Sequence, residues 1–294
     1  MTIVVHDAEV AVEANAELGE GPVWDPTASC LYFVDILLGR VHRSHLAGEP
    51  LETFEVDQPV GAIALTERGD LVLAVRDGFA RLDLTTRRVE LIADVETDRP
   101  DQRMNDGKCD PAGRFWAGTM ALDEHVEAGG LYRLGADLRV ARMLSGVTIS
   151  NGIDWTADGR TMFYIDSPTR RIDCFDFDVA EGTITNRRPF VQIPVEHGMP
   201  DGLTLDAEGG VWVALWGGGA VHRYLRDGSI DAIVRVPTPH PTSCIFGGRD
   251  LHHLYITSAS IKLSPHERAV HPLAGAVFRC DVGVSGREPR RFRG

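Results

Sequence analysis

A short apolar run recurs six times along the chain, and this repeat limits the possible folds more than any other feature of the sequence. The central residues of the runs lie 40 to 48 residues apart and are Tyr32, Val72, Trp116, Tyr164, Trp212 and Tyr255. Turns that combine polar residues with glycine precede most runs, at residues 67–70, 111–114, 157–160 and 207–210. Glycine supplies the positive φ of a tight hairpin, and a repeat of this length with about four strands per unit is typical of β-propeller blades. The sequence therefore predicts an all-β fold, a six-bladed β-propeller.

The repeat runs through the 294 residues without a low-complexity linker, so we expect one propeller domain over residues 1–294. A closed ring also requires the two ends of the chain to meet. Residues 3–12 alternate enough to form a strand, and we expect this strand to complete the last blade beside residues 276–282. Residues 287–293 hold four arginines and are expected to form a solvated tail.

Composition excludes some classes of partner. The net charge of −13, from 43 acidic and 30 basic residues, disfavours nucleic acid and anionic membranes. Five widely spaced cysteines argue against a disulfide framework. The first residues lack the basic region and apolar core of a secretion signal, so we expect a cytoplasmic protein, monomeric or weakly homo-oligomeric.

The register of the repeat predicts a central site. The strand nearest the axis should begin 11 to 13 residues before each apolar run, at Glu20, Val60, Asn105, Asn151, Asp201 and Ser243. Innermost strands begin around one mouth of the central channel. Two carboxylates and an amide oxygen, from Glu20, Asn151 and Asp201, would form a site for one divalent metal ion. Ca²⁺ is favoured, Mg²⁺ and Mn²⁺ also suit these ligands, and Zn²⁺ is less typical; the alternative is that these residues only shape turns.

Arg103 and Asn105 lie two residues apart in an extended segment, so both should face the channel and bind substrate hydroxyls or a carbonyl oxygen. The alternative is that Arg103 offsets a nearby aspartate and Asn105 shapes a turn. We expect Asp106 and Lys108 to point into the blade as a mutually compensating pair. Neither a GxSxG nucleophile elbow nor a phosphate-binding glycine loop occurs in the sequence.

Four stretches resemble the SMP-30/gluconolactonase/regucalcin family of six-bladed propellers. They are LGEGPVWD at 18–25, RMNDGKCDPAGRFWAGTM at 103–120, SNGIDWTADGRTMFYIDS at 150–167 and PDGLTLDAEGGVWVA at 200–214. The resemblance implies a metal-dependent lactonase with Glu20, Asn151 and Asp201 as metal ligands. It implies that Arg103 and Asn105 bind substrate, with an acidic residue after the GTM motif that contacts substrate hydroxyls. That residue is Asp123, with Glu124 as its neighbour.

We therefore expect a hydrolase that opens a sugar lactone, such as gluconolactone or a pentonolactone, to the aldonic acid. The ion would polarise the lactone carbonyl, and Asp201 is the candidate general base. One alternative is a hydrolase of a non-sugar lactone or a phosphotriester, which apolar pocket walls would favour over polar ones. The others are a non-catalytic calcium-binding regulatory propeller and a strictosidine-synthase-like propeller without this metal site.

Overall fold

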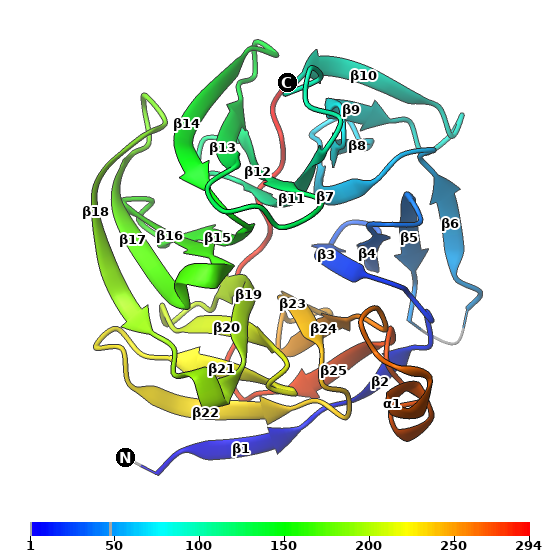
Figure 1. The fold of residues 1–294 in the computed structure, drawn as a ribbon, viewed down its shortest axis with the longest axis vertical. Helices are drawn as coiled ribbons and strands as arrows, with labels where there is room; N and C mark the ends of the chain where they lie inside the picture. The colour runs from blue at the N-terminus through cyan, green and yellow to red at the C-terminus, as the bar shows by residue number, and fades with distance from the viewer. Residues whose placement is uncertain (1, 47–48) are drawn as a thin grey trace.

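In the computed structural model, which describes residues 2–46 and 49–294, six β-sheets surround a central axis (Figure 1). Blade 1 contains β3 (Gly19–Asp25), β4 (Cys30–Asp35), β5 (Arg40–Ser44) and β6 (Glu52–Glu55), and blade 2 contains β7 (Val60–Leu65), β8 (Leu71–Val75), β9 (Gly78–Leu82) and β10 (Val89–Asp94). Blade 3 contains β11 (Gln102–Cys109), β12 (Phe115–Ala121), β13 (Gly129–Leu134) and β14 (Val140–Val147). Blade 4 contains β15 (Ser150–Trp155), β16 (Thr161–Asp166), β17 (Arg171–Asp178) and β18 (Thr183–Gln192).

Blade 5 contains β19 (Met199–Leu205), β20 (Val211–Trp216), β21 (Ala220–Tyr224) and β22 (Ile230–Arg235), and blade 6 contains β23 (Pro241–Gly247), β24 (His253–Ser258) and β25 (Val277–Asp281). Within the described ranges, three short helical segments lie in connecting loops: η1 (Ser167–Thr169), η2 (Val195–His197) and α1 (Pro265–Val270). No helix among the described residues is long and apolar enough to cross a membrane.

The sequence repeat is confirmed as the blade repeat. Each predicted apolar run forms the second strand of its blade: β4, β8, β12, β16, β20 and β24. Their side chains fill the space between neighbouring sheets, with Trp116 and Trp212 fully buried. The glycines of the predicted turns, Gly69, Gly113, Gly159 and Gly209, all have positive φ. The six-bladed propeller therefore follows from apolar strands and left-handed turns that recur together.

The N-terminal segment closes the ring, but differently from the expectation. It forms two strands, and only β2 (Glu9–Val12) pairs with β25, antiparallel, to complete blade 6. The first strand, β1 (Val4–Asp7), pairs in parallel with β22 and adds a fifth strand to blade 5. The chain switches sheets at Ala8, whose N–H donates to the carbonyl of Arg235. Two blades therefore have their outer edges covered by one segment, which protects unpaired strand edges.

The expectation of a solvated C-terminal tail is wrong. After β25 the chain crosses the axis of the propeller, as the red segment of Figure 1 shows. It contacts every blade, and its partners in blades 1 to 6 are Asp25, Leu65, Gly113, Asp154, Ala207 and Leu251. Phe292 is buried with the core of blades 2 and 3. The arginines follow this course because acidic side chains of different blades, Asp25, Glu67 and Asp154, accept hydrogen bonds from them.

Candidate functional site

Each innermost strand is irregular at the position where a site residue was expected. The strand pairing shifts between Glu20 and Val23 in β3, between Met104 and Gly107 in β11, between Ser150 and Ile153 in β15, and between Pro200 and Leu203 in β19. Comparable shifts occur in β7 and β23. A β-bulge leaves a residue outside the ladder and re-aims its side chain. The sequence therefore places its oxygen-bearing residues where the bulges turn side chains toward the axis.

A glycine follows several of these residues because neighbouring inner strands approach closely. A Cβ atom on Gly152 would lie 2.7 Å from the backbone nitrogen of Leu203 and 2.8 Å from the carbonyl oxygen of Asp201. A Cβ atom on Gly202 would lie 2.1 Å from the hydroxyl oxygen of Ser243. Neither glycine has a positive φ, so the requirement is for space, which only glycine supplies.

A cavity of about 230 Å³ opens at the mouth where the innermost strands begin. Five of the six predicted site residues line it: Glu20, Arg103, Asn105, Asn151 and Asp201. They come from β3, β11, β15 and β19, and all five are at most 8% exposed. The structure therefore brings together residues that lie up to 181 positions apart in the chain, from Glu20 to Asp201.

The two buried carboxylates of this cavity, Glu20 and Asp201, have only the guanidinium of Arg103, among the described residues, to offset their charge. Burial, followed by repulsion from Asp201 and Asp106, raises the pKa of Glu20 well above its usual value. Burial and repulsion from Asp106 likewise raise the pKa of Asp201. Arg103 opposes both shifts, although burial lowers the pKa of its guanidinium to about 10. The ionised carboxylates therefore lack sufficient countercharge, which a bound cation would supply.

Hydrogen bonds fix the amide side chains of the site. Arg103 Nη1 donates to Asn105 Oδ1 at 2.6 Å, and Asn105 Nδ2 donates to Asn151 Oδ1 at 3.0 Å. Asn151 Nδ2 donates to Ser167 Oγ at 2.7 Å, and this hydroxyl donates to the carbonyl of Pro200 at 2.6 Å. Asn151 Oδ1 is thereby oriented by two neighbouring side chains. Arg103 contacts Asn105 through this hydrogen bond and forms no ion pair with a nearby aspartate, Asp101 or Asp106, among the described residues.

The sixth predicted residue lies elsewhere. Asp123 is exposed and its carboxylate accepts a hydrogen bond from the backbone N–H of His125 at 3.1 Å. Its neighbour Glu124 lines the cavity and forms an ion pair with Lys262 at 2.5 Å. Lys262 belongs to a loop of blade 6, opposite blade 3 in the ring, so this ion pair spans the mouth. Counting residues after the GTM motif left Asp123 and Glu124 adjacent alternatives, and the left-handed φ of 60° at Glu124 decides which of them faces the cavity.

The walls of the cavity are largely apolar. Ten of the 18 lining residues are apolar: Leu18, Ile36, Leu37, Met120, Leu122, Ile149, Met199, Pro200, Trp216 and Ile261. Trp216 stacks on His240 with ring centroids 4.1 Å apart, which holds the indole in place. These residues were not singled out from the sequence because each reads as an ordinary strand or loop residue. The one sequence signal that could have identified them as cavity residues is their position at the same end of the blades as Asp201.

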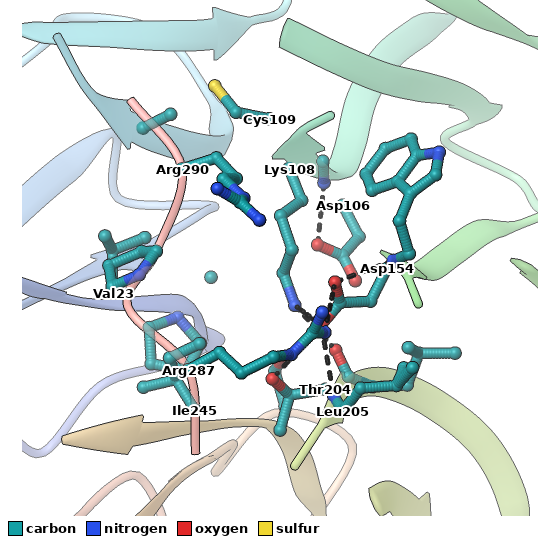
Figure 2. Close-up of a pocket in the computed structure, with 18 of the residues that line it drawn as sticks. Val23, Asp106, Lys108, Cys109, Asp154, Thr204, Leu205, Ile245, Arg287 and Arg290 are labelled. Atoms are coloured by element: carbon teal, nitrogen blue, oxygen red, sulfur yellow. Dashed lines mark hydrogen bonds and ion pairs between the residues drawn. The ribbon is translucent and has the colours of Figure 1, made fainter. Parts of the chain in front are cut away.

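A smaller cavity, of about 60 Å³, lies further along the innermost strands toward the other end of the channel (Figure 2). The C-terminal segment at residues 287–290 forms part of its wall. Lys108 was expected to compensate Asp106, and its charge does oppose the rise that burial causes in the pKa of Asp106. Its ion pair, however, is with Asp154 of the next blade, where Lys108 Nζ lies 3.2 Å from Asp154 Oδ2. Asp106 accepts a hydrogen bond from the N–H of Gly107 at 2.6 Å, and burial raises its pKa to about 6.

The chemistry of the first cavity fits a hard divalent cation. Its donor set comprises two buried carboxylates with raised pKa values and one oriented amide oxygen, and these are oxygen ligands of the kind that Ca²⁺, Mg²⁺ and Mn²⁺ prefer. Groups of three or more His, Cys, Asp and Glu with metal-binding geometry are absent from residues 2–46 and 49–294. A site here would therefore depend on the amide of Asn151 as the third ligand.

Comparison with known proteins identifies the family to which this fold belongs. The family model described as SMP-30/gluconolactonase/LRE-like region matches residues 18–260. Regucalcin from Gallus gallus is 40% identical over 284 residues, which cover 94% of this chain and 95% of that protein. The Bacillus subtilis protein named "Putative sugar lactone lactonase YvrE" is 35% identical over 290 residues, which cover 98% of this chain and 99% of that protein.

Among solved structures, a calcium-binding protein, regucalcin, from Agrobacterium tumefaciens superposes with a TM-score of 0.95 at 31% identity and 99% coverage of both chains. The chain belongs to the SMP-30/gluconolactonase/LRE-like family, as its sequence motifs indicated. This membership and the lactonase-named relative support a lactone-hydrolysing enzyme.

Proposed function

We propose that this protein is a divalent-metal-dependent lactonase that opens a sugar lactone, such as gluconolactone or a pentonolactone, to the aldonic acid. The observation that carries the proposal is the convergence of Glu20, Asn151 and Asp201, from three blades, on one cavity where both carboxylates are buried without sufficient countercharge. The calcium-binding description of the Agrobacterium regucalcin favours Ca²⁺, with Mg²⁺, Mn²⁺ and Zn²⁺ as alternatives. A cytoplasmic location and a monomeric or weakly oligomeric state remain predictions.

In this proposal Glu20, Asn151 and Asp201 hold the ion, which when bound supplies Lewis-acid polarisation of a carbonyl group. Arg103 carries guanidinium N–H groups that can donate to the lactone carbonyl or to a hydroxyl. Asn105 is already oriented by Arg103 and Asn151, and both of its amide N–H groups are engaged, so its Oδ1 is the atom that can accept a hydrogen bond from the substrate. Asp123 was the expected hydroxyl acceptor, and the placement of Glu124 in the cavity supports Glu124 for this role.

Asp201 is the candidate general base. Its carboxylate would accept a proton from the attacking water while the water oxygen bonds to the carbonyl carbon. The ring C–O bond then breaks, and the proton passes to the departing alkoxide, which gives the hydroxy acid. The raised pKa of Asp201 favours proton acceptance, whereas a bound cation opposes it, so its role as ligand is the stronger assignment.

Hydrolysis of a non-sugar lactone is the second candidate, and the apolar walls favour it. Each substrate hydroxyl that faces Leu18, Met120 or Trp216 would lose its water partners without gaining a new one. A buried hydroxyl left in this way costs about 1–3 kcal/mol. An alkyl or aryl substituent would instead gain contacts there. The non-catalytic regulator has less support, because a cavity of about 230 Å³ beside Arg103 and Asn105 exceeds what ion binding alone requires.

The test is hydrolysis of matched lactones by chelator-treated protein, with Ca²⁺, Mg²⁺, Mn²⁺ or Zn²⁺ returned singly. The panel contains gluconolactone, a pentonolactone, an alkyl δ-lactone and an aryl lactone. Metal-restored hydrolysis that is lost in Asp201→Ala and Asn151→Ala is expected, and Arg103→Ala should raise KM more than it weakens metal binding. Preference for the alkyl or aryl lactone would select the second candidate, and no hydrolysis of any lactone despite metal binding would reject the lactonase.

A further inference from the structure

A second layer of polar contacts lies next to the candidate site, further along the innermost strands. Lys108, Asp154 and Thr204 each follow a site residue by three positions, namely Asn105, Asn151 and Asp201. Because the spacing is the same in three blades, this layer repeats the geometry of the site further along the same strands, β11, β15 and β19. The layer lines the smaller cavity of Figure 2.

The contacts of this layer join the three strands to one another. Lys108 Nζ donates to Asp154 Oδ2 at 3.2 Å and to the carbonyl of Leu203 at 3.0 Å. Asp154 Oδ2 also accepts from the backbone N–H of Leu205 at 3.0 Å. Figure 2 shows the Lys108 amine and the Asp154 carboxylate pointing toward each other across the cavity. Both members of the ion pair therefore contact the backbone of β19, Lys108 at the carbonyl of Leu203 and Asp154 at the N–H of Leu205.

These contacts matter because the inner strands of different blades belong to separate sheets. No backbone ladder sets the distance between β11, β15 and β19 among the described residues, so side chains and packing must set it. The site layer has its own links, from Asn105 to Asn151 and from Ser167 to Pro200. An ion pair whose side chains are 24% and 14% exposed adds a link that solvent screens only in part.

The charge state of Asp154 suits this role. Burial opposes ionisation, but Lys108, Arg287 and the backbone N–H groups of Trp155 and Leu205 together outweigh it and lower the pKa of Asp154. Arg287 reaches Asp154 Oδ1 at 3.4 Å from the C-terminal segment. The carboxylate is therefore ionised at neutral pH and is held from two sides.

We propose that Lys108 and Asp154 are positioning residues for the metal site, which set the spacing of the strands that carry Asn105, Asn151 and Asp201. This inference rests on the proposed function, because it takes these strands to carry the metal site. Neither residue touches the ion or the substrate in the proposal. Residues outside the ligand set that orient metal ligands commonly change metal affinity by about 10- to 100-fold when they are replaced.

The test measures cation affinity directly, by calorimetric titration of the chelator-treated full chain with Ca²⁺ or Mn²⁺ alone. Lys108→Met keeps the aliphatic stem and removes the donors, and Asp154→Asn keeps the shape of the side chain and removes the charge. Both are expected to raise the Kd about 10-fold or more. The double variant should raise the Kd by less than the product of the two single effects, because both substitutions remove the shared contact between Lys108 and Asp154.

A control variant separates positioning from general stability. Arg223→Met breaks a buried ion pair with Asp206, in which Arg223 Nε lies 2.7 Å from Asp206 Oδ2, away from the channel. It should lower the melting temperature and leave the Kd within twofold of wild type. The proposal is overturned if Lys108→Met and Asp154→Asn behave like this control. If Lys108→Met does not fold, two other variants test the proposal. Asp154→Asn should still raise the Kd, and Lys108→Arg, which keeps the positive charge, should retain much of the wild-type affinity.

The same titration distinguishes failure of the proposed function. A wild-type protein that binds neither cation would reject the metal site and the positioning pair together. A wild-type protein that binds metal but hydrolyses no lactone would reject the lactonase alone, and the comparison of Kd values would still decide on Lys108 and Asp154.

Discussion

The side-chain amide of Asn105 donates a hydrogen bond to Oδ1 of Asn151 at 3.0 Å, and it joins two blades that share no sheet. The same amide donates to the carbonyl of Ser150 at 2.7 Å. Asn105 thus holds the one neutral member of the proposed ligand set, and it is itself held by Arg103. The orientation of a ligand oxygen in blade 4 depends on a side chain of blade 3.

Replacing Asn105 should therefore weaken metal binding as well as substrate binding. Asn105→Ala leaves the buried carbonyl of Ser150 and Asn151 Oδ1 without this donor, at a cost of about 1–3 kcal/mol. We expect the Kd for Ca²⁺ to rise several-fold and kcat/KM for the lactone to fall about 10-fold or more. Calorimetry and steady-state kinetics would measure the two effects. An unchanged Kd with a raised KM would limit Asn105 to substrate contact.

The stability of the metal-free protein should depend on pH through its buried carboxylates. Glu20 and Asp201 have raised pKa values in the folded state, so their contribution to stability is fully present below their unfolded pKa values and is lost as the pH rises through the folded ones. Asp106, with a pKa of about 6, acts in the same direction.

We therefore expect the melting temperature of chelator-treated protein to fall as the pH is raised from about 5 to about 8. Addition of Ca²⁺ should recover most of this loss, because it supplies the missing positive charge. Asp201→Asn should flatten the pH dependence, raise the metal-free stability by about 0.5–2 kcal/mol and abolish activity. His42, His222 and His240, whose pKa values are lowered by burial, act in the opposite direction, so the comparison with Asp201→Asn decides: an identical pH dependence in the two proteins would contradict the assignment.

The glycine that follows Asn151 should not tolerate a methyl group. In Gly152→Ala the new Cβ would lie 2.7 Å from Leu203 N and 2.8 Å from Asp201 O, and it would force β15 and β19 apart. We expect a loss of about 1–3 kcal/mol in the free energy of unfolding, together with weaker Ca²⁺ binding. Chemical denaturation and titration would measure these changes.

Gly69→Ala is the matched control, because Gly69 has a φ of +90° and no heavy atom within 4 Å of its added Cβ. Its cost should come from backbone strain alone, about 1–2 kcal/mol, with no change in metal affinity. Equal effects of the two alanines on the Kd would show that strand spacing at Gly152 does not govern the site.

The C-terminal segment should contribute strongly to the stability of the ring. Phe292 is 1% exposed, its N–H donates to the carbonyl of Leu65 at 2.8 Å, and its carbonyl accepts from Glu67. Phe292→Ala should lower the free energy of unfolding by about 3–5 kcal/mol, measured by denaturation in urea. Arg290→Ala, at an exposed position of the same segment, should stay within about 0.5 kcal/mol of wild type. Similar small losses in both variants would show that the segment merely lies on the surface.

The sequence by itself determined the blades and the register of the site. Apolar strands, turn glycines and the positions of Glu20, Asn151 and Asp201 are local features, because strand alternation and positive φ depend on neighbouring residues. Their repetition placed equivalent residues around one axis, so five of the six predicted site residues could be assigned to one cavity before any contact was known.

Only the tertiary structure decided the contacts between blades. Lys108 pairs with Asp154, 46 residues away, and Arg287 reaches Asp154 across 133 residues. The ion pair of Glu124 with Lys262, the apolar cavity walls and the course of the tail also depend on how the ring closes. Such contacts have no signature in the local sequence, because the separation between two strands of different sheets is set by the packing of the whole ring.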